Sequence, residues 1–236
     1  MILDFTTTAT NRIDIIEQTY KSFTTNLKGV DFKRCTLYIN IDPIPNMNCN
    51  DFEKIKNMCL KYFGKIVANV PKKPNYTQAY KWLFTNATNQ FVFNLEDDFA
   101  LIRQIEITDL LYYFDKYPEL YCVALRLHHY HYKSIPTSPQ LLHRRYYKSV
   151  GLGLDPSINP EIQLRGKKWG LEMPTFRPEY GPKIDTNGRL VVYPEPTGPE
   201  NVITIDIGRD WIEHSGFKRP DTKEKFLTWE QSNGIR

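Results

Sequence analysis

The stretch Phe91-Val92-Phe93-Asn94-Leu95-Glu96-Asp97-Asp98 joins a short apolar run to three consecutive acidic residues. The apolar run has the length of a buried β-strand. Adjacent carboxylates repel one another, so they lower stability unless a cation or hydrogen-bond donors lie among them. Ligands of open α/β sheets bind beyond the carboxyl ends of the strands, and Mg²⁺ and Mn²⁺ prefer oxygen ligands. The stretch therefore predicts a site for a divalent cation and a nucleotide diphosphate.

Strands and helices alternate along the first 130 residues, which predicts βαβ units and a largely parallel sheet. We expect strands at 3–8, 35–42, 65–70, 91–95 and 121–127, and helices at 13–27, 52–63, 76–85 and 110–117. Beyond Pro136, prolines and glycine-rich turns replace this alternation, and only 202–208 reads clearly as a strand. The second half is therefore expected to be rich in loops, which usually carry specificity.

Bulk composition indicates a soluble protein of one domain. The chain has 236 residues, of which 41% are hydrophobic and 25% charged, as in ordinary globular proteins. A net charge of +4 suits anionic ligands but is too weak to imply nucleic acid. The sequence has no signal-like start and no apolar run long enough to span a membrane. Its four cysteines lack metal-site spacing, so we expect free thiols and a cytoplasmic location.

Four stretches, taken in order, resemble a GT-A-fold glycosyltransferase, closest to the family 2-like group. Phe5 to Arg12 is similar to the first strand and the Thr-x-x-Asn-Arg turn of that family. Ile39 to Asp42 resembles the second strand, whose end meets the nucleotide base, and Asn75 to Ala79 the helix before the acidic strand. Glu96-Asp97-Asp98 falls at the DxD-type motif. The resemblance implies a Rossmann-type sheet with a nucleotide-sugar-binding half at 1–132 and an acceptor half at 133–236.

The acidic triplet is the expected metal site. The resemblance implies that Asp98 holds Mn²⁺ or Mg²⁺, that Asp97 assists, and that Glu96 contacts the ribose or metal-bound waters. A metal that bridges both phosphates neutralises the charge growing on the departing nucleotide diphosphate. The alternative is a solvated turn whose carboxylates accept hydrogen bonds from backbone donors.

Residues at the ends of the first two strands are candidates for the nucleotide. Thr8 and Asn11 are expected to hydrogen-bond the base, and Arg12 to pair with a phosphate or close the floor of the pocket. The same residues are compatible with the start of a helix followed by an exposed arginine. Asp42 is expected to accept from a uracil N–H, although an aspartate before Pro43 also suits a turn.

Two roles are assigned to the second half of the chain. Many GT-A enzymes complete the metal site with a histidine from this half, and His214 fits, although a surface or capping histidine is the alternative. An inverting transferase needs a carboxylate that takes the acceptor proton. Glu172, after Trp169-Gly170-Leu171, is the first choice for this base, and Asp210 is the reserve. A retaining enzyme needs neither.

Histidines and basic residues form three further clusters. His129 and His131 would share one face of a strand, as zinc ligands do, but an acceptor-contacting edge or a solvated strand end is preferred. Basic and aromatic residues at 143–148 and 165–169 suit an acceptor that bears phosphate or is a nucleic acid, with rings available for stacking. Solvated loop charge is the simpler interpretation.

The sequence thus predicts a metal-dependent glycosyltransferase that moves a sugar from a nucleotide-diphosphate donor, expected to be a UDP-sugar, to an acceptor hydroxyl. A glycan precursor and a hydroxylated DNA base both fit as acceptors, and no membrane partner is expected. A nucleotidyltransferase of similar architecture is the nearest alternative, but Thr6 to Arg12 lacks the glycine-rich loop that those enzymes use. A non-catalytic protein that binds a sugar or nucleic acid on this scaffold is the second alternative.

Overall fold

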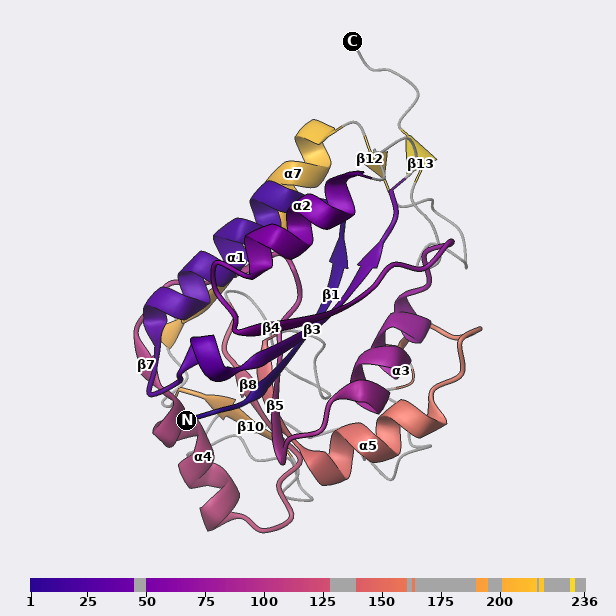
Figure 1. Cartoon of the computed structure of the whole chain (residues 1–236). Helices are drawn as coiled ribbons and strands as arrows, with labels where there is room; N and C mark the ends of the chain where they lie inside the picture. Colours follow the sequence, from indigo (N-terminus) through magenta and orange to yellow (C-terminus); the bar gives the residue numbers. More distant parts are fainter. Residues whose placement is uncertain are drawn as a thin grey trace.

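A seven-stranded sheet forms the centre of the computed structural model, which describes residues 1–44, 50–127, 139–160, 163, 190–194, 201–215, 217–218 and 230–231. The strand order is β10-β8-β9-β5-β1-β3-β4. Strand β9 is antiparallel to both of its neighbours, and the other pairs are parallel. The predicted α/β sheet is therefore confirmed (Figure 1). The strands are β1 (Asp4–Thr10), β3 (Thr36–Asp42), β4 (Lys65–Asn69), β5 (Phe91–Asn94), β8 (Cys122–Leu125), β9 (Gln140–His143) and β10 (Leu190–Tyr193).

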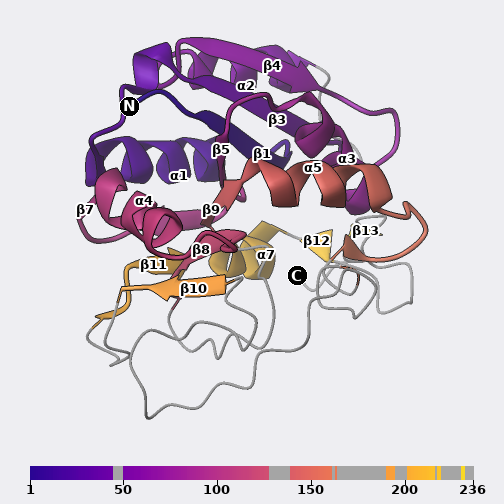
Figure 2. The same ribbon diagram turned by 90° about the horizontal axis from the view of Figure 1, so that it is seen from below.

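Helices cover both faces of this sheet (Figures 1 and 2). One face packs against α1 (Ile13–Asn26), α2 (Asn50–Cys59) and α4 (Ile107–Lys116). The other face packs against α3 (Tyr76–Asn86) and α5 (Arg144–Gly153). Successive residues of a strand point to opposite faces, and most of the strands therefore supply side chains to both cores.

Aromatic rings pack against one another in the larger core where β1 meets β5. Phe5 of β1 lies between Phe63 and Phe93, with ring centroids 5.1 and 5.6 Å away. All three side chains are fully buried or nearly so. Burying one such side chain stabilises the fold by about 1.5–3 kcal/mol, so this cluster holds β1 and β5 together beneath the edge where both strands end.

Short elements that the sequence pattern did not predict occur in both halves of the chain. They are β2 (Leu27–Lys28), η1 (Phe32–Arg34), β6 (Phe99–Leu101), β7 (Ile105–Glu106), α7 (Gly208–Ser215), β12 (Phe217–Lys218) and β13 (Glu230–Gln231), whereas β11 (Thr204–Asp206) lies within a predicted strand. Strand β11 pairs with β6, which follows the acidic triplet directly. The strand expected over 202–208 is shorter because Asp206 accepts the Gly208 N–H at 2.9 Å and helix α7 begins there.

The basic and aromatic stretch at 143–148 is not a loop. His143 ends β9, and α5 begins at Arg144. Tyr146 and Tyr147 are buried against the α3 side of the sheet, so their rings are not available to stack on a ligand. The clusters 128–131 and 165–169, together with Glu172, lie outside the described residues.

No helix among the described segments has the length and apolar character needed to cross a membrane. Cys35, Cys59 and Cys122 are buried thiols that form no disulfide, as predicted for these three, and Cys49 lies outside the described residues.

The register between β1 and β5 is fixed at the end of the sheet far from the acidic triplet. The buried carboxylate of Asp4 accepts hydrogen bonds from the backbone N–H groups of Thr88 and Asn89, at 2.7 and 2.9 Å. The Asn89 side chain donates a third bond at 2.8 Å. These bonds tie the turn before β5 to the start of β1, so Asp4 pairs with Val92 and the two strands run in step toward the acids.

Replacing Asp4 with alanine should destabilise the fold by about 1–3 kcal/mol, because it removes the buried acceptor of the hydrogen bonds from Thr88 and Asn89. Urea denaturation of wild type and variant measures this loss. Asp4→Asn keeps one acceptor oxygen and should lose less. Equal stability of wild type and Asp4→Ala would show that this turn does not depend on the carboxylate.

Candidate functional site

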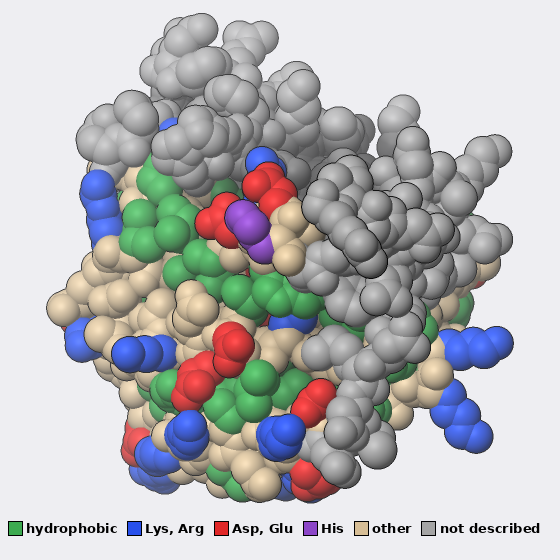
Figure 3. All heavy atoms as spheres, turned by 90° about the horizontal axis from the view of Figure 1, so that it is seen from above, with side chains coloured by type: hydrophobic (Ala, Val, Ile, Leu, Met, Phe, Trp, Pro, Cys, Tyr) green, Lys and Arg blue, Asp and Glu red, His purple; other side chains and the backbone are tan. Residues whose placement is uncertain are grey.

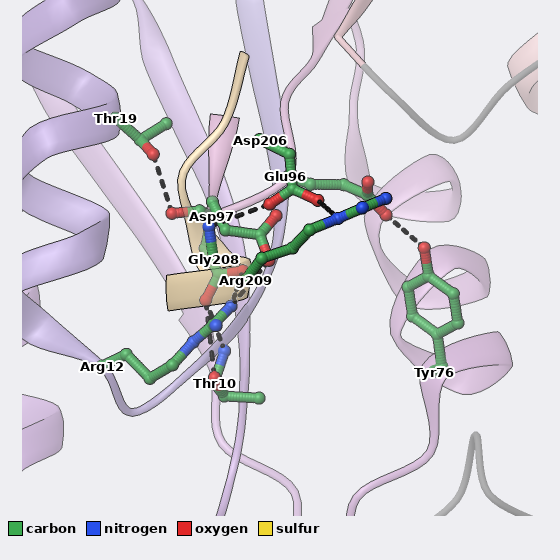
Figure 4. Close-up of polar contacts among 10 residues, drawn as sticks. Thr10, Arg12, Thr19, Tyr76, Glu96, Asp97, Asp206, Gly208 and Arg209 are labelled. Atoms are coloured by element: carbon green, nitrogen blue, oxygen red, sulfur yellow. Dashed lines mark hydrogen bonds and ion pairs between the residues drawn. The ribbon is translucent and has the colours of Figure 1, made fainter. Parts of the chain in front are cut away.

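Three neighbouring strands end at the same edge of the sheet. Thr10, at the end of β1, pairs in register with Asp42, at the end of β3. On the other side of β1, Thr6 pairs with Asn94, the last residue of β5. The acidic triplet after β5, the turn after β1 and Asp42 are therefore brought together, although 85 residues separate Arg12 in one turn from Asp97 in the other (Figure 4).

A buried arginine joins the two aspartates. Arg12 donates from Nη2 to Oδ1 of Asp97 at 2.7 Å and to Oδ2 of Asp98 at 3.1 Å. Its side chain is 2% exposed. Burial alone would lower the pKa of Arg12, but the charges of Asp97 and Asp98 outweigh it and raise that pKa. The guanidinium is thus a permanent cation inside the acidic cluster, in place of the exposed arginine that the alternative interpretation described.

Asp97 works as an anchor. Beyond Arg12, its carboxylate accepts the backbone N–H of Thr10 at 3.0 Å, and its carbonyl accepts the hydroxyl of Thr19 at 2.8 Å. The residue is 5% exposed. Asp97 therefore fastens the acidic turn to both the end of β1 and the middle of α1.

Asp98 is the more accessible of the pair, with 21% of its side chain exposed. Burial and the neighbouring charge of Asp97 raise the pKa of Asp98 to about 6, while Arg12 acts in the opposite direction. Asp206 raises it further. A partly exposed carboxylate with only one oxygen held by Arg12 has an oxygen left for a cation or for a ligand donor.

Helix α7 closes the site from the second half of the chain. The backbone carbonyl of Asp98 accepts the N–H of Ile207 at 2.8 Å. Gly208 is packed so tightly against Asp98 that a Cβ there would lie 2.4 Å from Oδ2 and 2.7 Å from Cβ. Trp211, one turn later, places its ring 5.0 Å from the Arg12 guanidinium, a cation–π contact.

The residues that the sequence selected on this helix lie farther along it. Asp210 and His214 are exposed, and the Nδ1 of His214 donates to the Asp210 carbonyl at 2.7 Å. His214 follows Gly208 by six residues, which is about 9 Å of helical rise. Figure 3 shows acidic side chains beside a histidine on the face where α7 lies. Within the described part of the chain, no three His, Cys, Asp or Glu side chains are grouped to hold a metal.

Asp42 is not a simple turn residue. It is 8% exposed, and its carboxylate accepts from the Asn40 side chain at 2.8 Å and from the backbone N–H of Asn75. Burial raises the pKa of Asp42 to about 6, and these two donors limit the rise. Asn75 also caps α3 by accepting the Gln78 N–H at 2.9 Å, as expected for a helix start.

Asn11 and Thr8 are both buried at this edge. The side chain of Asn11 does not cap α1, because its Oδ1 accepts the backbone N–H of Ile44 at 2.9 Å. Its Nδ2 is buried and has no hydrogen-bond partner among the described residues. An unpaired buried donor costs stability, so the Nδ2 of Asn11 is a candidate donor to a ligand carbonyl.

Glu96 turns away from the two aspartates. Its carboxylate accepts a hydrogen bond from the Tyr76 hydroxyl, in the first turn of α3. Figure 4 shows Arg12 and Tyr76 on opposite sides of the triplet, so Glu96 faces a different partner from Asp97 and Asp98. This arrangement reduces the mutual repulsion that the sequence predicted for adjacent carboxylates.

Sequence reasoning missed Asp206, Trp211 and Tyr76. Asp206 pairs in register with Phe99, the residue after Asp98, and the antiparallel pairing of β11 with β6 brings it to the site. Its carboxylate also accepts from Arg209 Nε at 3.2 Å. The sequence signal for Asp206 was a strand that ends in an acidic residue shortly before a glycine. The pairing of this strand with one about 100 residues earlier cannot be read from the local sequence.

Comparison with solved structures identifies the fold. S. aureus TarS matches with a TM-score of 0.56 at 10% identity over 90% of this chain, and its 1–349 fragment in complex with UDP-GlcNAc with a TM-score of 0.55 at 8% identity over 87%. The mannosyltransferase PcManGT from Pyrobaculum calidifontis, in complex with GDP-Man and Mn²⁺, matches with a TM-score of 0.55 at 9% identity over 86%. The chain has the GT-A fold.

This GT-A chain spans 38% of the TarS chain, 58% of the TarS fragment and 56% of PcManGT. No protein-family model and no curated protein matches its sequence. The likeness therefore concerns the three-dimensional arrangement of the GT-A fold and leaves the chemistry to the residues at the sheet edge.

Replacing Gly208 with alanine should displace Asp98 and weaken its pairing with Arg12. A helical alanine is favoured over glycine by about 1 kcal/mol, but the overpacking costs about 1–3 kcal/mol. We expect a net loss of stability in chemical denaturation. Glu213→Ala, at an exposed position of α7, serves as the control and should change stability little. A more stable Gly208→Ala protein would contradict the close contact.

Proposed function

We propose that this chain is a metal-dependent glycosyltransferase that takes a sugar from a nucleotide-diphosphate donor, with UDP-sugar as the expected donor. The main support is Asp98, a partly exposed carboxylate that follows β5 on a GT-A sheet and lies between Arg12 and α7. Asp42 and Asn11 lie at the ends of the adjacent strands. A base, a ribose and a diphosphate laid along this edge would meet these groups in turn.

The side chains fit a hard divalent cation. The Asp98 oxygen that Arg12 leaves free is a suitable ligand, and Asp206 lies close enough to act on Asp98 electrostatically. Bound Mn²⁺ or Mg²⁺ would supply charge neutralisation at the diphosphate. Water and phosphate oxygens would complete the ligand set, and His214 stays a proposed additional ligand. PcManGT, a structural neighbour, was solved with Mn²⁺.

Arg12 keeps Asp98 usable as a ligand. Without a cation beside it, the carboxylate of Asp98 would hold its proton more tightly, since burial and Asp97 both raise its pKa. Arg12 opposes that rise and favours the ionised form near neutral pH. Trp211 packs on the same guanidinium and fixes its place.

Asp42 is proposed to receive the base. An ionised carboxylate only accepts hydrogen bonds, so it suits the ring N–H of uracil or guanine better than cytosine, whose corresponding nitrogen is an acceptor. Asn11 would donate to a base carbonyl, Thr8 would line the same pocket, and Glu96 would contact the ribose. The structural neighbours were solved with UDP-GlcNAc and GDP-Man, which supports this class of donor.

The acceptor half is proposed to supply the base and the acceptor contacts. Glu172 is proposed as the base that takes the acceptor proton, with the exposed Asp210 as the reserve. A glycan precursor or a hydroxylated DNA base would provide the acceptor hydroxyl. The burial of Tyr146 and Tyr147 removes one proposed stacking surface for a nucleic acid, and the basic groups of α5 remain.

Calorimetric titration tests the donor site. UDP, GDP and CDP are titrated into wild type with Mn²⁺ or with EDTA. We expect UDP to bind in Mn²⁺ and its affinity to fall by about tenfold or more in EDTA and in Asp98→Asn, which corresponds to about 1.4 kcal/mol.

Asp115→Asn is the matched control, because Asp115 is exposed on α4, away from this edge of the sheet (Figure 1). It should bind UDP as wild type does. Absence of binding for all three nucleotides, with and without metal, would reject the donor site and favour a binding protein without this activity.

A further inference from the structure

Two asparagine side chains connect β4, the outer strand of the sheet, to Asp42 through hydrogen bonds. Asn69, the last residue of β4, pairs in register with Asn40 on β3. Its Nδ2 donates to the Asn40 Oδ1 at 2.6 Å, and the Asn40 Nδ2 donates to the Asp42 Oδ1 at 2.8 Å. Asn40 is 1% exposed, whereas Asn69 is half-buried on the edge strand.

The direction of these two bonds matters. Because Asn69 uses a donor toward Asn40, Asn40 must turn its oxygen to Asn69 and its NH₂ group to Asp42. An Asn40 in the reverse orientation would place its oxygen against the Asp42 carboxylate, and two acceptors facing each other repel unless the carboxyl holds a proton. The donor from Asn69 and the ionised carboxylate of Asp42 therefore favour the same orientation of the Asn40 amide.

We propose that Asn40 and Asn69 are positioning residues that hold Asp42 as a hydrogen-bond acceptor for the nucleotide base. This inference rests on the proposed function, because Asp42 is taken there as the base contact. Neither asparagine needs to touch the nucleotide, and Asn69 acts only through Asn40.

The electrostatics of Asp42 agree with this role. Burial raises its pKa to about 6, the Asn40 and Asn75 donors lower it, and Asp97 is the charged side chain that raises it. Loss of the Asn40 donor should raise the pKa of Asp42 further. A protonated Asp42 places an O–H donor opposite the N–H donor of the base, and the hydrogen bond between them is lost. Nucleotide affinity should therefore fall as the pH drops through the pKa of Asp42 and recover above that pKa.

Asn69→Asp tests the proposal, because it replaces the NH₂ group of the side chain with an oxygen and changes little else in its shape. Aspartate cannot donate, so Asn40 is expected to turn its NH₂ group to position 69 and its oxygen to Asp42. The pH midpoint of UDP binding, measured by calorimetry with Mn²⁺, should move upward by about one unit, a tenfold change in proton affinity. Asn69→Ala adds no charge but removes the donor that holds the Asn40 oxygen, so its midpoint should move in the same direction and by less than in Asn69→Asp.

A double-mutant cycle separates this rotation from the plain effect of a new charge. In an Asn40→Leu background no amide can turn, and Asn69→Asp then acts on Asp42 only through space. The proposal predicts a larger shift from Asn69→Asp when Asn40 is present than in the Asn40→Leu background. Equal shifts in the two backgrounds would overturn it, provided that thermal unfolding shows all four proteins to be folded.

A second readout does not need the nucleotide. The pKa of Asp42, followed by carboxyl ¹³C NMR and assigned with Asp42→Asn, should rise in Asn69→Asp. If that pKa moves but wild type binds no nucleotide, the proposed function fails and the positioning role for a base falls with it. If wild type binds UDP and neither the pKa nor the binding midpoint moves, the positioning role alone is overturned.

Discussion

The site depends on one buried cation, the guanidinium of Arg12, placed between two carboxylates that follow strand β5. Asp97 and Asp98 meet it at 2.7 and 3.1 Å. Removing one partner of a buried pair is costly because the other charge stays without compensation. The fold therefore has to bring the turn after β1 and the turn after β5 together, and the pairing of β1 with β5 does this.

The positions of the other residues at this edge follow from the pairing of β1 with its two neighbouring strands. Parallel strands end on the same side of the sheet, so the polar residues that follow each strand gather there. Below the edge the strands are apolar and carry Phe5 and Phe93, which pack at 5.6 Å. Rigid strands position Asp42 and Asp98, and α7 adds Trp211 from the far end of the chain. The proposed donor site is thus formed by elements that are hydrogen-bonded to one another or packed in contact.

The local sequence pattern predicted the helices and strands that depend on neighbouring residues. The alternation of strands and helices through residue 127 and the helix start at Asn75 were apparent because periodicity and capping act over a few residues. The antiparallel β9, the α5 helix and the pairing of β11 with β6 were not, since they depend on contacts far apart in the sequence. For the same reason the Arg12–Asp97 pair and the contact between Asp98 and Gly208 escaped prediction, although Arg12, Asp97 and Asp98 were each selected.

A crystal structure with UDP and Mn²⁺, in which the manganese is located by its anomalous scattering, would examine the donor site at the level of single atoms. We expect one manganese peak bonded to an Asp98 oxygen at about 2.0–2.2 Å and to the diphosphate, with the uracil against Asp42 and Arg12 still beside Asp97. A nucleotide bound elsewhere, or a manganese ion without Asp98 among its ligands, would contradict the assignment of this edge as the donor site.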